Sequence, residues 1–353
     1  MIELKEDPLR DEVRYLGQLL GGVIEAQEGA DFLAFEEEVR KLSKRRRRED
    51  VPVATLREMI EKCDTPALFA LCRAFSIFFD LANLAEDRHR IRVLRQREKA
   101  TEPSPRKESI RAALKYLREQ GVEPAQLLEI LEFSFIEPVF TAHPTEAKRR
   151  TVRSKLRRIR ELMKGLASDQ LLAREAKRVE TDVRSELMTL WETDLLRAKR
   201  PTVLEELDRS LFFLNSLWEV VPQLVGDLRD GVREFYPEIE ERLPSLIQFG
   251  TWIGGDRDGN PYVTPAVTAS ALEKLRRKTL KKHRKSCRYL LDHLSQSTVR
   301  IDFHQGLVKR LEHYEEEFPA LAAVLKRQPS EEIYRRYLEA VHWRLLQTEN
   351  RGA

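Results

Sequence analysis

Apolar residues recur three or four positions apart through much of the first 60 residues, which is the spacing of one helical face. Residues 9–27 predict an amphipathic helix, and the pattern continues through residues 32–42. Residues 54–62 predict a third, short helix. The start of the chain is therefore expected to be a set of helices that pack through their apolar faces.

The segment that begins at Thr65-Pro66 is apolar on nearly every side. Thr65 is expected to cap this helix and Pro66 to occupy its first position, where a missing N–H costs nothing. A helix without a polar face is expected to lie at the centre of the core. It is predicted to end in the charged stretch 86–90, and two prolines within residues 99–107 predict a loop.

Two short segments break the helical rhythm. Residues 135–140 and 246–253 are rich in branched and aromatic side chains and are followed by turn-forming residues, so both are predicted to be buried β-strands. A long helix is predicted after each, at residues 145–199 and 265–298. Strand, loop and helix in repeated order indicate a parallel β/α sheet or barrel.

The expected fold is mostly α-helical, with the two β-strands belonging to an incomplete parallel (β/α) barrel of the TIM type, because closure takes about eight strands. Residues 1–132 are expected to form an N-terminal helical region, and residues 133–353 a partial barrel with long helical insertions. The low glycine content, 14 of 353 residues, agrees with a helical protein.

The charge of the chain is nearly balanced, with 63 basic and 59 acidic residues and a net charge of +4. This balance does not indicate nucleic-acid binding. No uninterrupted apolar run approaches the roughly 18 residues of a membrane span, and the first twelve residues lack the apolar centre of a signal peptide. Three unclustered cysteines fit a reduced setting. We therefore expect a cytoplasmic protein with no nucleic-acid or membrane partner.

Residues 44–48, Lys-Arg-Arg-Arg-Arg, form a run of five basic residues. A solvated helix end beside acidic stretches is the simpler interpretation. A nucleic-acid patch, together with the basic stretch 276–285, is the alternative, but no aromatic residues are interleaved with the run.

The first candidate site follows the first predicted strand, at the strand end where β/α proteins place their active sites. Residues 141–146 read Thr-Ala-His-Pro-Thr-Glu. Pro144 is expected to begin the next helix, whose free N–H groups favour an anion and whose dipole favours a neutral His143 that accepts a proton. Arg149 and Arg150 add positive charge one turn on. A buried histidine that caps the helix is the alternative, and local pattern alone does not decide between the two.

The second candidate site follows the second predicted strand, in residues 252–261, Trp-Ile-Gly-Gly-Asp-Arg-Asp-Gly-Asn-Pro. Three glycines within six residues stand out in a glycine-poor chain. The paired Gly254 and Gly255 are expected to allow a positive φ or a close backbone approach. Thr264-Pro265 is then expected to cap the helix that follows.

Charged side chains alternate in the same string. Asp256 and Asp258 are expected to hold Arg257 between them by charge-assisted hydrogen bonds. A tight turn with an internal ion pair and no other role is the alternative. A calcium loop is disfavoured, because Val267 stands where the closing carboxylate is needed.

Taken together, the two strings resemble those of the phosphoenolpyruvate carboxylase family. Residues 139–150, VFTAHPTEAKRR, are similar to the family's first signature, and residues 249–265, FGTWIGGDRDGNPYVTP, to its second N-terminal block. Further similar blocks occur at residues 78–92, 190–202 and 334–348, so the resemblance covers essentially the whole chain.

The resemblance implies a carbon–carbon lyase that joins phosphoenolpyruvate and bicarbonate, with Mg²⁺ or Mn²⁺, to give oxaloacetate and phosphate. This is a carbon dioxide fixation that supplies the tricarboxylic acid cycle. His143 matches the general base that takes the proton of carboxyphosphate. Trp252 matches a wall of the apolar pocket around CO₂ and the enolate.

Other residues carry weaker implications from the same resemblance. The turn after the second strand would shape the substrate pocket, through Gly254, Gly255, Asp256 and Arg257. Three arginines match those linked in some members to a sugar-phosphate activator site, namely Arg149, Arg150 and Arg197.

Members of the family are more than twice as long as this chain, and the resemblance assigns the metal-binding carboxylates to their C-terminal part. We therefore expect a fragment, a truncated product or one piece of a split gene, inactive by itself. Its expected partners are the two substrates, further copies of itself (the family forms tetramers) or a complementary C-terminal polypeptide. The alternative is a non-catalytic helical remnant or regulatory scaffold.

Overall fold

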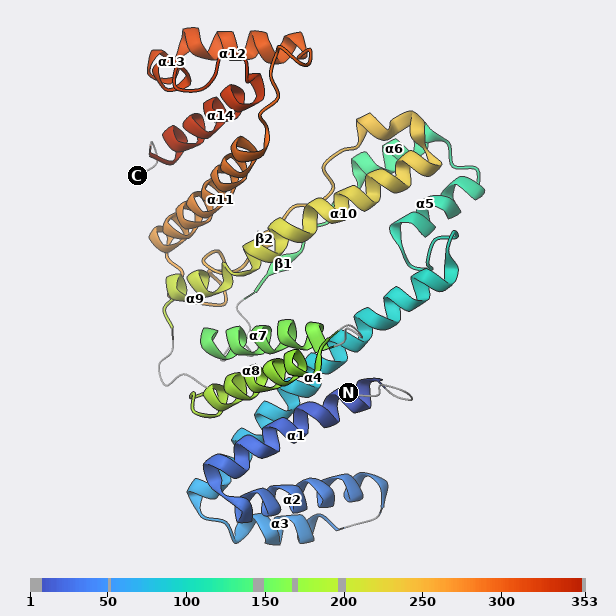
Figure 1. Cartoon of the computed structure of the whole chain (residues 1–353), viewed down its shortest axis with the longest axis vertical. Helices are drawn as coiled ribbons and strands as arrows, with labels where there is room; N and C mark the ends of the chain where they lie inside the picture. Colours follow the sequence, from blue (N-terminus) through green and yellow to red (C-terminus); the bar gives the residue numbers. More distant parts are fainter. Residues whose placement is uncertain (1–7, 50–51, 142–148, 167–170, 196–200, 351–353) are drawn as a thin grey trace. The chain divides into compact units, whose positions relative to one another are not determined.

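The computed structural model describes residues 8–49, 52–141, 149–166, 171–195 and 201–350 (Figure 1). In chain order, its first elements are α1 (Pro8–Glu28), α2 (Ala30–Arg48), α3 (Val53–Glu61), α4 (Thr65–Thr101), α5 (Ile110–Glu119), α6 (Pro124–Phe133), β1 (Val139–Phe140), α7 (Arg150–Leu166) and α8 (Ala173–Trp191). They are followed by α9 (Val203–Ser210), α10 (Phe213–Phe235), the 3₁₀ helix η2 (Pro237–Arg242), β2 (Gly250–Thr251), α11 (Pro265–His293), α12 (Gln305–Glu317), α13 (Pro319–Leu325) and α14 (Ile333–Asn350). The described part is thus mostly helical with two short strands, as predicted.

The chain divides into two compact units. The first unit comprises Met1–Ile136, His143–Arg200 and Trp218–Ile247, and the second comprises Glu137–Ala142, Pro201–Leu217 and Gln248–Ala353. This division follows compactness alone, so the expected domain boundary at residues 132 and 133 stays a prediction.

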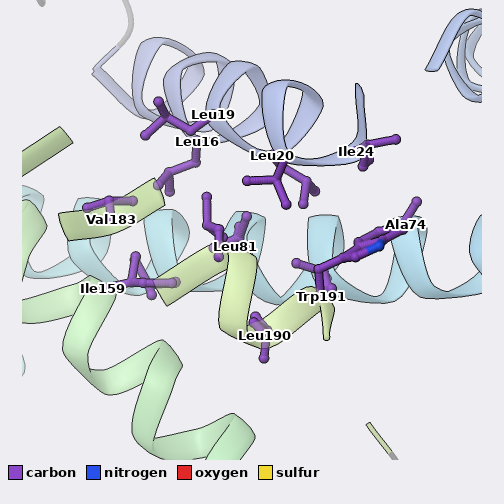
Figure 2. Close-up of a cluster of buried hydrophobic side chains, with 14 of the residues drawn as sticks. Leu16, Leu19, Leu20, Ile24, Ala74, Leu81, Ile159, Val183, Leu190 and Trp191 are labelled. Atoms are coloured by element: carbon purple, nitrogen blue, oxygen red, sulfur yellow. The ribbon is translucent and has the colours of Figure 1, made fainter. Parts of the chain in front are cut away.

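The main core of the first unit lies where α1, α4, α7 and α8 pack together (Figure 2). The apolar positions that predicted the first helix are the buried ones, so α1 forms as expected. Figure 2 shows side chains from all four helices pointing toward one another, among them Leu16, Leu20, Ala74, Leu81, Ile159, Val183, Leu190 and Trp191. Burial of this apolar surface is the main force that holds the four helices together.

A buried ion pair lies beside this core. Glu12 of α1 accepts hydrogen bonds from Arg88 and, at 2.6 Å, from Arg92, both on α4. Arg88 also donates to the carbonyl oxygens of Arg160 and Met163, at 3.2 and 2.8 Å, in the last turns of α7. One guanidinium therefore compensates a buried carboxylate and also binds backbone carbonyl groups near the end of a helix.

The helix predicted from Thr65 differs in three details. Asp64 is its N-cap, because the Asp64 carboxylate accepts from the Ala67 N–H at 2.8 Å, and Thr65 is the first helical residue. The helix continues beyond residue 90 to Thr101. It is also not buried all round, because Phe69 and Phe79 are exposed. In the described chain this one helix is long and apolar enough to span a membrane by length and composition, with 33% of its apolar window buried. A core helix meets the same criterion, so this is weak support for a membrane role.

The prediction of a single helix over residues 145–199 is wrong. Two helices stand there instead, and α7 packs against α8. Both contribute to the same core, through Ile159 and Met163 of α7 and Val183 and Leu187 of α8. A break between them allows both apolar faces to be buried together, which one straight helix would not.

Two smaller cores complete the helical framework. In the first unit, α5, α6, the end of α10 and η2 enclose Leu114, Leu127 and the fully buried Tyr236. In the second unit, α12, α13 and α14 form another core around Leu311, Leu321 and Ala340. There α11 packs along α14, with the ion pair of Arg284 and Glu349 between them.

One histidine of α14 is buried. His342 is 9% exposed and lies 3.9 Å from Glu339. Burial, the charge of Arg288 and that of Arg284 lower the pKa of His342, and the carboxylate of Glu339 opposes them. The folded chain therefore favours the neutral imidazole at this position.

Candidate functional site

The two predicted strands pair in parallel. Val139 pairs with Gly250 and Phe140 with Thr251, and an isolated parallel bridge joins Ile136 to Ile247. The last bond of the ladder runs from the Trp252 N–H to the Phe140 carbonyl oxygen, at 2.8 Å. Parallel pairing places the carboxyl ends of both strands side by side, so Thr141 and Trp252 lead into loops at the same sheet end.

The strands are shorter and more exposed than predicted. Each has two residues, and Val139 and Phe249 keep about 40% of their surface exposed, 41% and 40%. Phe140 is half-buried and stacks on Phe213, with ring centroids 5.0 Å apart. The expectation of buried strands is therefore wrong for this chain, because two strands offer too little surface to cover each other.

The turn that follows β2 is held by its own backbone and by one carboxylate. The N–H groups of Gly255 and Asp256 both donate to the Trp252 carbonyl oxygen, at 3.0 Å. The Asp256 carboxylate accepts from the Gly259 N–H at 3.1 Å. Asn260 closes the turn in the same way, since its side-chain oxygen accepts from the Tyr262 N–H at 3.0 Å. The local polar residues thus form a chain of Asx-type turns.

Gly254 meets both expectations for the paired glycines. Its φ is +84°, and a Cβ atom built there would lie 2.7 Å from the Cβ of Ala271 on α11. Ala271, Ile253 and Leu207 of α9 form a small buried cluster. The turn therefore packs closely against α11 at Gly254, where any larger residue would clash with Ala271. The predicted cap of α11 is confirmed, because Thr264 accepts from the Val267 N–H at 3.3 Å.

The expected clamp on Arg257 is not present. Within the described turn, neither Asp256 nor Asp258 forms an ion pair with Arg257. The Arg257 Nη2 atom instead lies 3.4 Å from the Thr268 Oγ1 atom in the first turn of α11. Asp256 is occupied with the backbone of Gly259, which explains why it does not also hold the arginine. Arg257 is exposed, and within the described part of the chain Thr268 is its hydrogen-bond partner.

Trp252 is 55% exposed. Its neighbour along the turn, Tyr262, is 71% exposed. Two large aromatic side chains thus stand at the strand end without cover from the described chain, and the pocket role of Trp252 stays a prediction.

The arginines expected at an anion site are only partly described. Arg149, just before α7, donates to Asp194 at 3.1 Å, and Asp194 also lies 3.9 Å from Arg73 of α4. Arg150 begins α7 and is exposed. Sequence reasoning missed Asp194 because it lies 45 residues from Arg149, without any local pattern that links the two. His143, Pro144 and Arg197 lie outside the described residues, so their expected roles are not tested.

Metal ligands were expected outside this chain. In the ranges that the structure describes, no three His, Cys, Asp or Glu side chains lie close enough together to hold a metal ion. These residues do not fit a Mg²⁺ or Mn²⁺ site, and we assign none of them to the metal.

Two sequence motifs thus follow adjacent parallel strands, which is the order of elements in β/α proteins. Residues 9–353 match the phosphoenolpyruvate carboxylase family. The chain therefore belongs to that family.

Individual relatives agree with this assignment. A phosphoenolpyruvate carboxylase of Roseiflexus castenholzii is 36% identical over 348 residues, which cover 98% of this chain and 37% of that protein. One from Xanthomonas oryzae pv. oryzae is 36% identical, over 97% of this chain and 38% of that protein. One from Thermus sp. (strain 71) is 37% identical, over 95% of this chain and 37% of that protein. The chain thus spans somewhat more than a third of the length of these relatives, in agreement with an N-terminal portion.

Proposed function

We propose that this chain is the N-terminal portion of a phosphoenolpyruvate carboxylase and supplies the proton acceptor of its active site. The observation that carries the proposal is the 2.8 Å hydrogen bond from the Trp252 N–H to the Phe140 carbonyl oxygen, which aligns the ends of the two motif strands. His143 follows Phe140 by three positions, and the glycine-rich turn follows Trp252 directly.

The proposed reaction has two stages. Bicarbonate attacks the phosphorus of phosphoenolpyruvate, the P–O bond to the enol breaks, and carboxyphosphate and the enolate of pyruvate form. His143 then accepts the carboxyphosphate proton, CO₂ and phosphate separate, and the enolate carbon attacks CO₂ to give oxaloacetate. A neutral imidazole beside an anion site suits the proton transfer.

Trp252 is proposed to shield the reactive intermediates. An enolate that meets water is protonated to pyruvate, so a site that excludes water favours carboxylation. Trp252 is 55% exposed in this chain, and Val139 and Phe249 beside it are about 40% exposed. We propose that the remaining strands of a TIM-type barrel cover this apolar surface, and that they carry the ligands of Mg²⁺ or Mn²⁺.

Complementation tests the proposal. Oxaloacetate formation from phosphoenolpyruvate, bicarbonate and Mg²⁺ is measured with this chain alone and again with the C-terminal remainder of the Roseiflexus castenholzii relative as a second polypeptide. We expect activity only from the mixture. Activity of the chain alone would contradict the assignment of the metal ligands to the remainder. An inactive mixture that nevertheless forms a stable complex would favour the non-catalytic scaffold.

The role of His143 is tested in the active mixture. We expect His143→Asn to abolish oxaloacetate formation while bicarbonate-dependent phosphate release continues, because carboxyphosphate still forms without the base and is then hydrolysed by water to bicarbonate and phosphate, while the enolate is protonated to pyruvate. His313→Asn is the matched control, since the His313 side chain is 67% exposed on α12. Full oxaloacetate formation by His143→Asn would refute the assignment.

A further inference from the structure

Charged side chains hold the contact between α11 and α14 at two places. Arg284 on α11 forms an ion pair with Glu349 on α14. Two turns further along α11, the Leu291 carbonyl oxygen accepts a hydrogen bond at 3.1 Å from the Arg335 Nε atom on α14. The second half of α11 therefore lies against α14, and the two helices run in opposite directions there.

His342 lies in the middle of this contact. Residues 335, 342 and 349 follow one another at intervals of seven, which is two helical turns, so they share one face of α14. The opposite face packs on α12 and α13 through Ala340 and Trp343. Because His342 is 9% exposed, its imidazole is enclosed between α14 and α11.

Two cations of α11 act on this imidazole. Burial of His342, the charge of Arg288 and that of Arg284 lower its pKa, and Glu339 opposes them. Cys287 follows Arg284 by three positions and is 8% exposed. Burial raises the pKa of its thiol, so Cys287 stays neutral in acid. A protonated His342 would therefore add a positive charge beside two others.

The nearby carboxylates compensate this added charge only in part. The Glu339 Oε1 atom lies 3.9 Å from the His342 Nδ1 atom, beyond hydrogen-bond distance, and its Oε2 atom accepts from Gln328 at 3.5 Å. From α12, Glu315 pairs with Arg336 on the far face of α14. The helix α13 carries no charged residue. The closed contact therefore favours the neutral imidazole.

We propose that His342 is a pH-sensitive latch, whose protonation separates the second half of α11 from α14 while both helices stay folded. The apolar core around Leu311 and Ala340 keeps α14 attached to α12 and α13. At its other end, α11 supports the turn of the candidate site, where Gly254 lies against Ala271. The latch thus links acidity to the helix on which that turn rests, and it is independent of the proposed carboxylase activity.

The pH window follows from the direction of the pKa shift. Because the pKa of His342 is lower in the closed contact than the ordinary 6.5, the contact is fully stable above pH 6.5 and weakens as pH falls toward the closed-state pKa. Opening takes up one proton in that window, so its equilibrium constant should rise about tenfold for each unit of pH. Below the closed-state pKa both states are protonated, and the rise should end.

Thiol modification of the whole chain tests the latch, with Cys287 as the reporter of opening. Cys287 is buried and is expected to be protected at neutral pH, whereas Cys72 is exposed. Dithiodipyridine, which modifies thiols in mild acid, is applied from about pH 7.5 to about pH 5, and mass spectrometry of digests gives both rates. We expect the ratio of the Cys287 rate to the Cys72 rate to rise about tenfold per pH unit below pH 6.5. In His342→Gln the ratio should stay nearly constant over the whole range.

Arg288→Gln gives a second test that leaves the buried residues unchanged. It removes a repelling charge, so the closed-state pKa of His342 should move back toward its ordinary value and the acid-induced rise should become smaller. Lys285→Gln is the matched control, since it removes another exposed cation of α11 that lies three positions from Arg288. We expect Lys285→Gln to keep the full rise.

A constant ratio in the unaltered chain, or an equal rise in His342→Gln, would overturn the latch. Equal effects of Arg288→Gln and Lys285→Gln would overturn it too, because they would show a response to overall charge. Loss of helical content over the same pH range, measured by circular dichroism, would show acid unfolding in place of local opening and would also overturn it. Circular dichroism at neutral pH confirms that each variant is folded.

Discussion

Gly254 is the position at which the fold and the candidate site depend most directly on one residue. Its φ of +84° lies in the left-handed region, where an alanine costs about 1–2 kcal/mol. The alanine Cβ would also lie 2.7 Å from the Cβ of Ala271, which is 3% exposed on α11 and has no room to move. Overpacking of this kind costs about 1–3 kcal/mol. Gly254→Ala is therefore expected to destabilise the chain by about 2–5 kcal/mol.

Gly255 provides the matched comparison. A Cβ atom there would meet the carbonyl oxygens of Thr251 and Trp252 at 3.4 and 3.9 Å, which are ordinary contacts, and Gly255 has no positive φ. Gly255→Ala is expected to cost less than about 1 kcal/mol. Urea unfolding of both variants, followed by circular dichroism, measures the difference. A loss for Gly254→Ala no larger than that for Gly255→Ala would refute the reasoning.

A double-mutant cycle separates the two costs at Gly254. Ala271→Gly removes the opposing Cβ. In the Gly254→Ala background it should therefore restore the stability lost to overpacking, while the stability lost to backbone strain should remain lost. We expect a coupling energy of about 1–3 kcal/mol between the two sites. A coupling near zero would show that the turn moves away from α11 and that the contact with Ala271 does not position it.

Three further predictions concern the helical framework. Glu12→Ala leaves the buried guanidinium of Arg88 without its main partner and should cost about 3 kcal/mol in urea unfolding, whereas Asp11→Ala, which removes a half-buried carboxylate paired with the exposed Arg14, should cost about 0.5–1 kcal/mol. Because the pKa of His342 is lowered in the folded chain, its contribution to stability is present above pH 6.5, the unfolded value, and is lost as pH falls toward the folded pKa. His342→Gln should therefore flatten the pH dependence of unfolding in that acidic window, and an unchanged profile would contradict this origin. Burial raises the pKa of the Cys287 thiol, so iodoacetamide should modify the exposed Cys72 first and Cys287 only after unfolding, as mass spectrometry of digests can follow.

The helices could be predicted well wherever local spacing alone determines them. The apolar positions of residues 9–27 are the buried face of α1, because one side of that helix meets the core along its whole length. The failures arise where tertiary packing decides. The prediction of one helix over residues 145–199 passed over the local break signals Gly165, Ser168 and Asp169, because both halves have helical spacing and the break serves their joint burial with α1 and α4. The cap of α4 was displaced by one residue because Asp64 and Thr65 are both good caps, and only the geometry decides.

At the candidate site, residue types predicted the backbone conformation better than they predicted which side chains interact. The positive φ at Gly254 and the cap at Thr264 follow from backbone requirements that only particular residues meet. The partner of Arg257 was predicted wrongly, because adjacency in sequence suggested the two aspartates. The carboxylate of Asp256 instead satisfies a nearer backbone N–H, and the arginine reaches Thr268 on the following helix. Side-chain contacts across 11 or 45 residues depend on how elements pack, which spacing along the chain does not encode.

The exposed apolar side chains around β1 and β2 give the proposed assembly a direct spectroscopic test. Two strands of two residues are marginal by themselves, and side chains at their ends are exposed, Trp252 most of all at 55%. If the C-terminal remainder supplies further strands, these strands must bury the indole of Trp252. The fluorescence of Trp252 should then shift to shorter wavelength, and its quenching by acrylamide should fall. Comparison with Trp252→Phe isolates this signal from the three other tryptophans, of which Trp191 is already 2% exposed. A complex that forms without changing the Trp252 signal would place the remainder elsewhere on the chain and would refute completion of the sheet at this strand end.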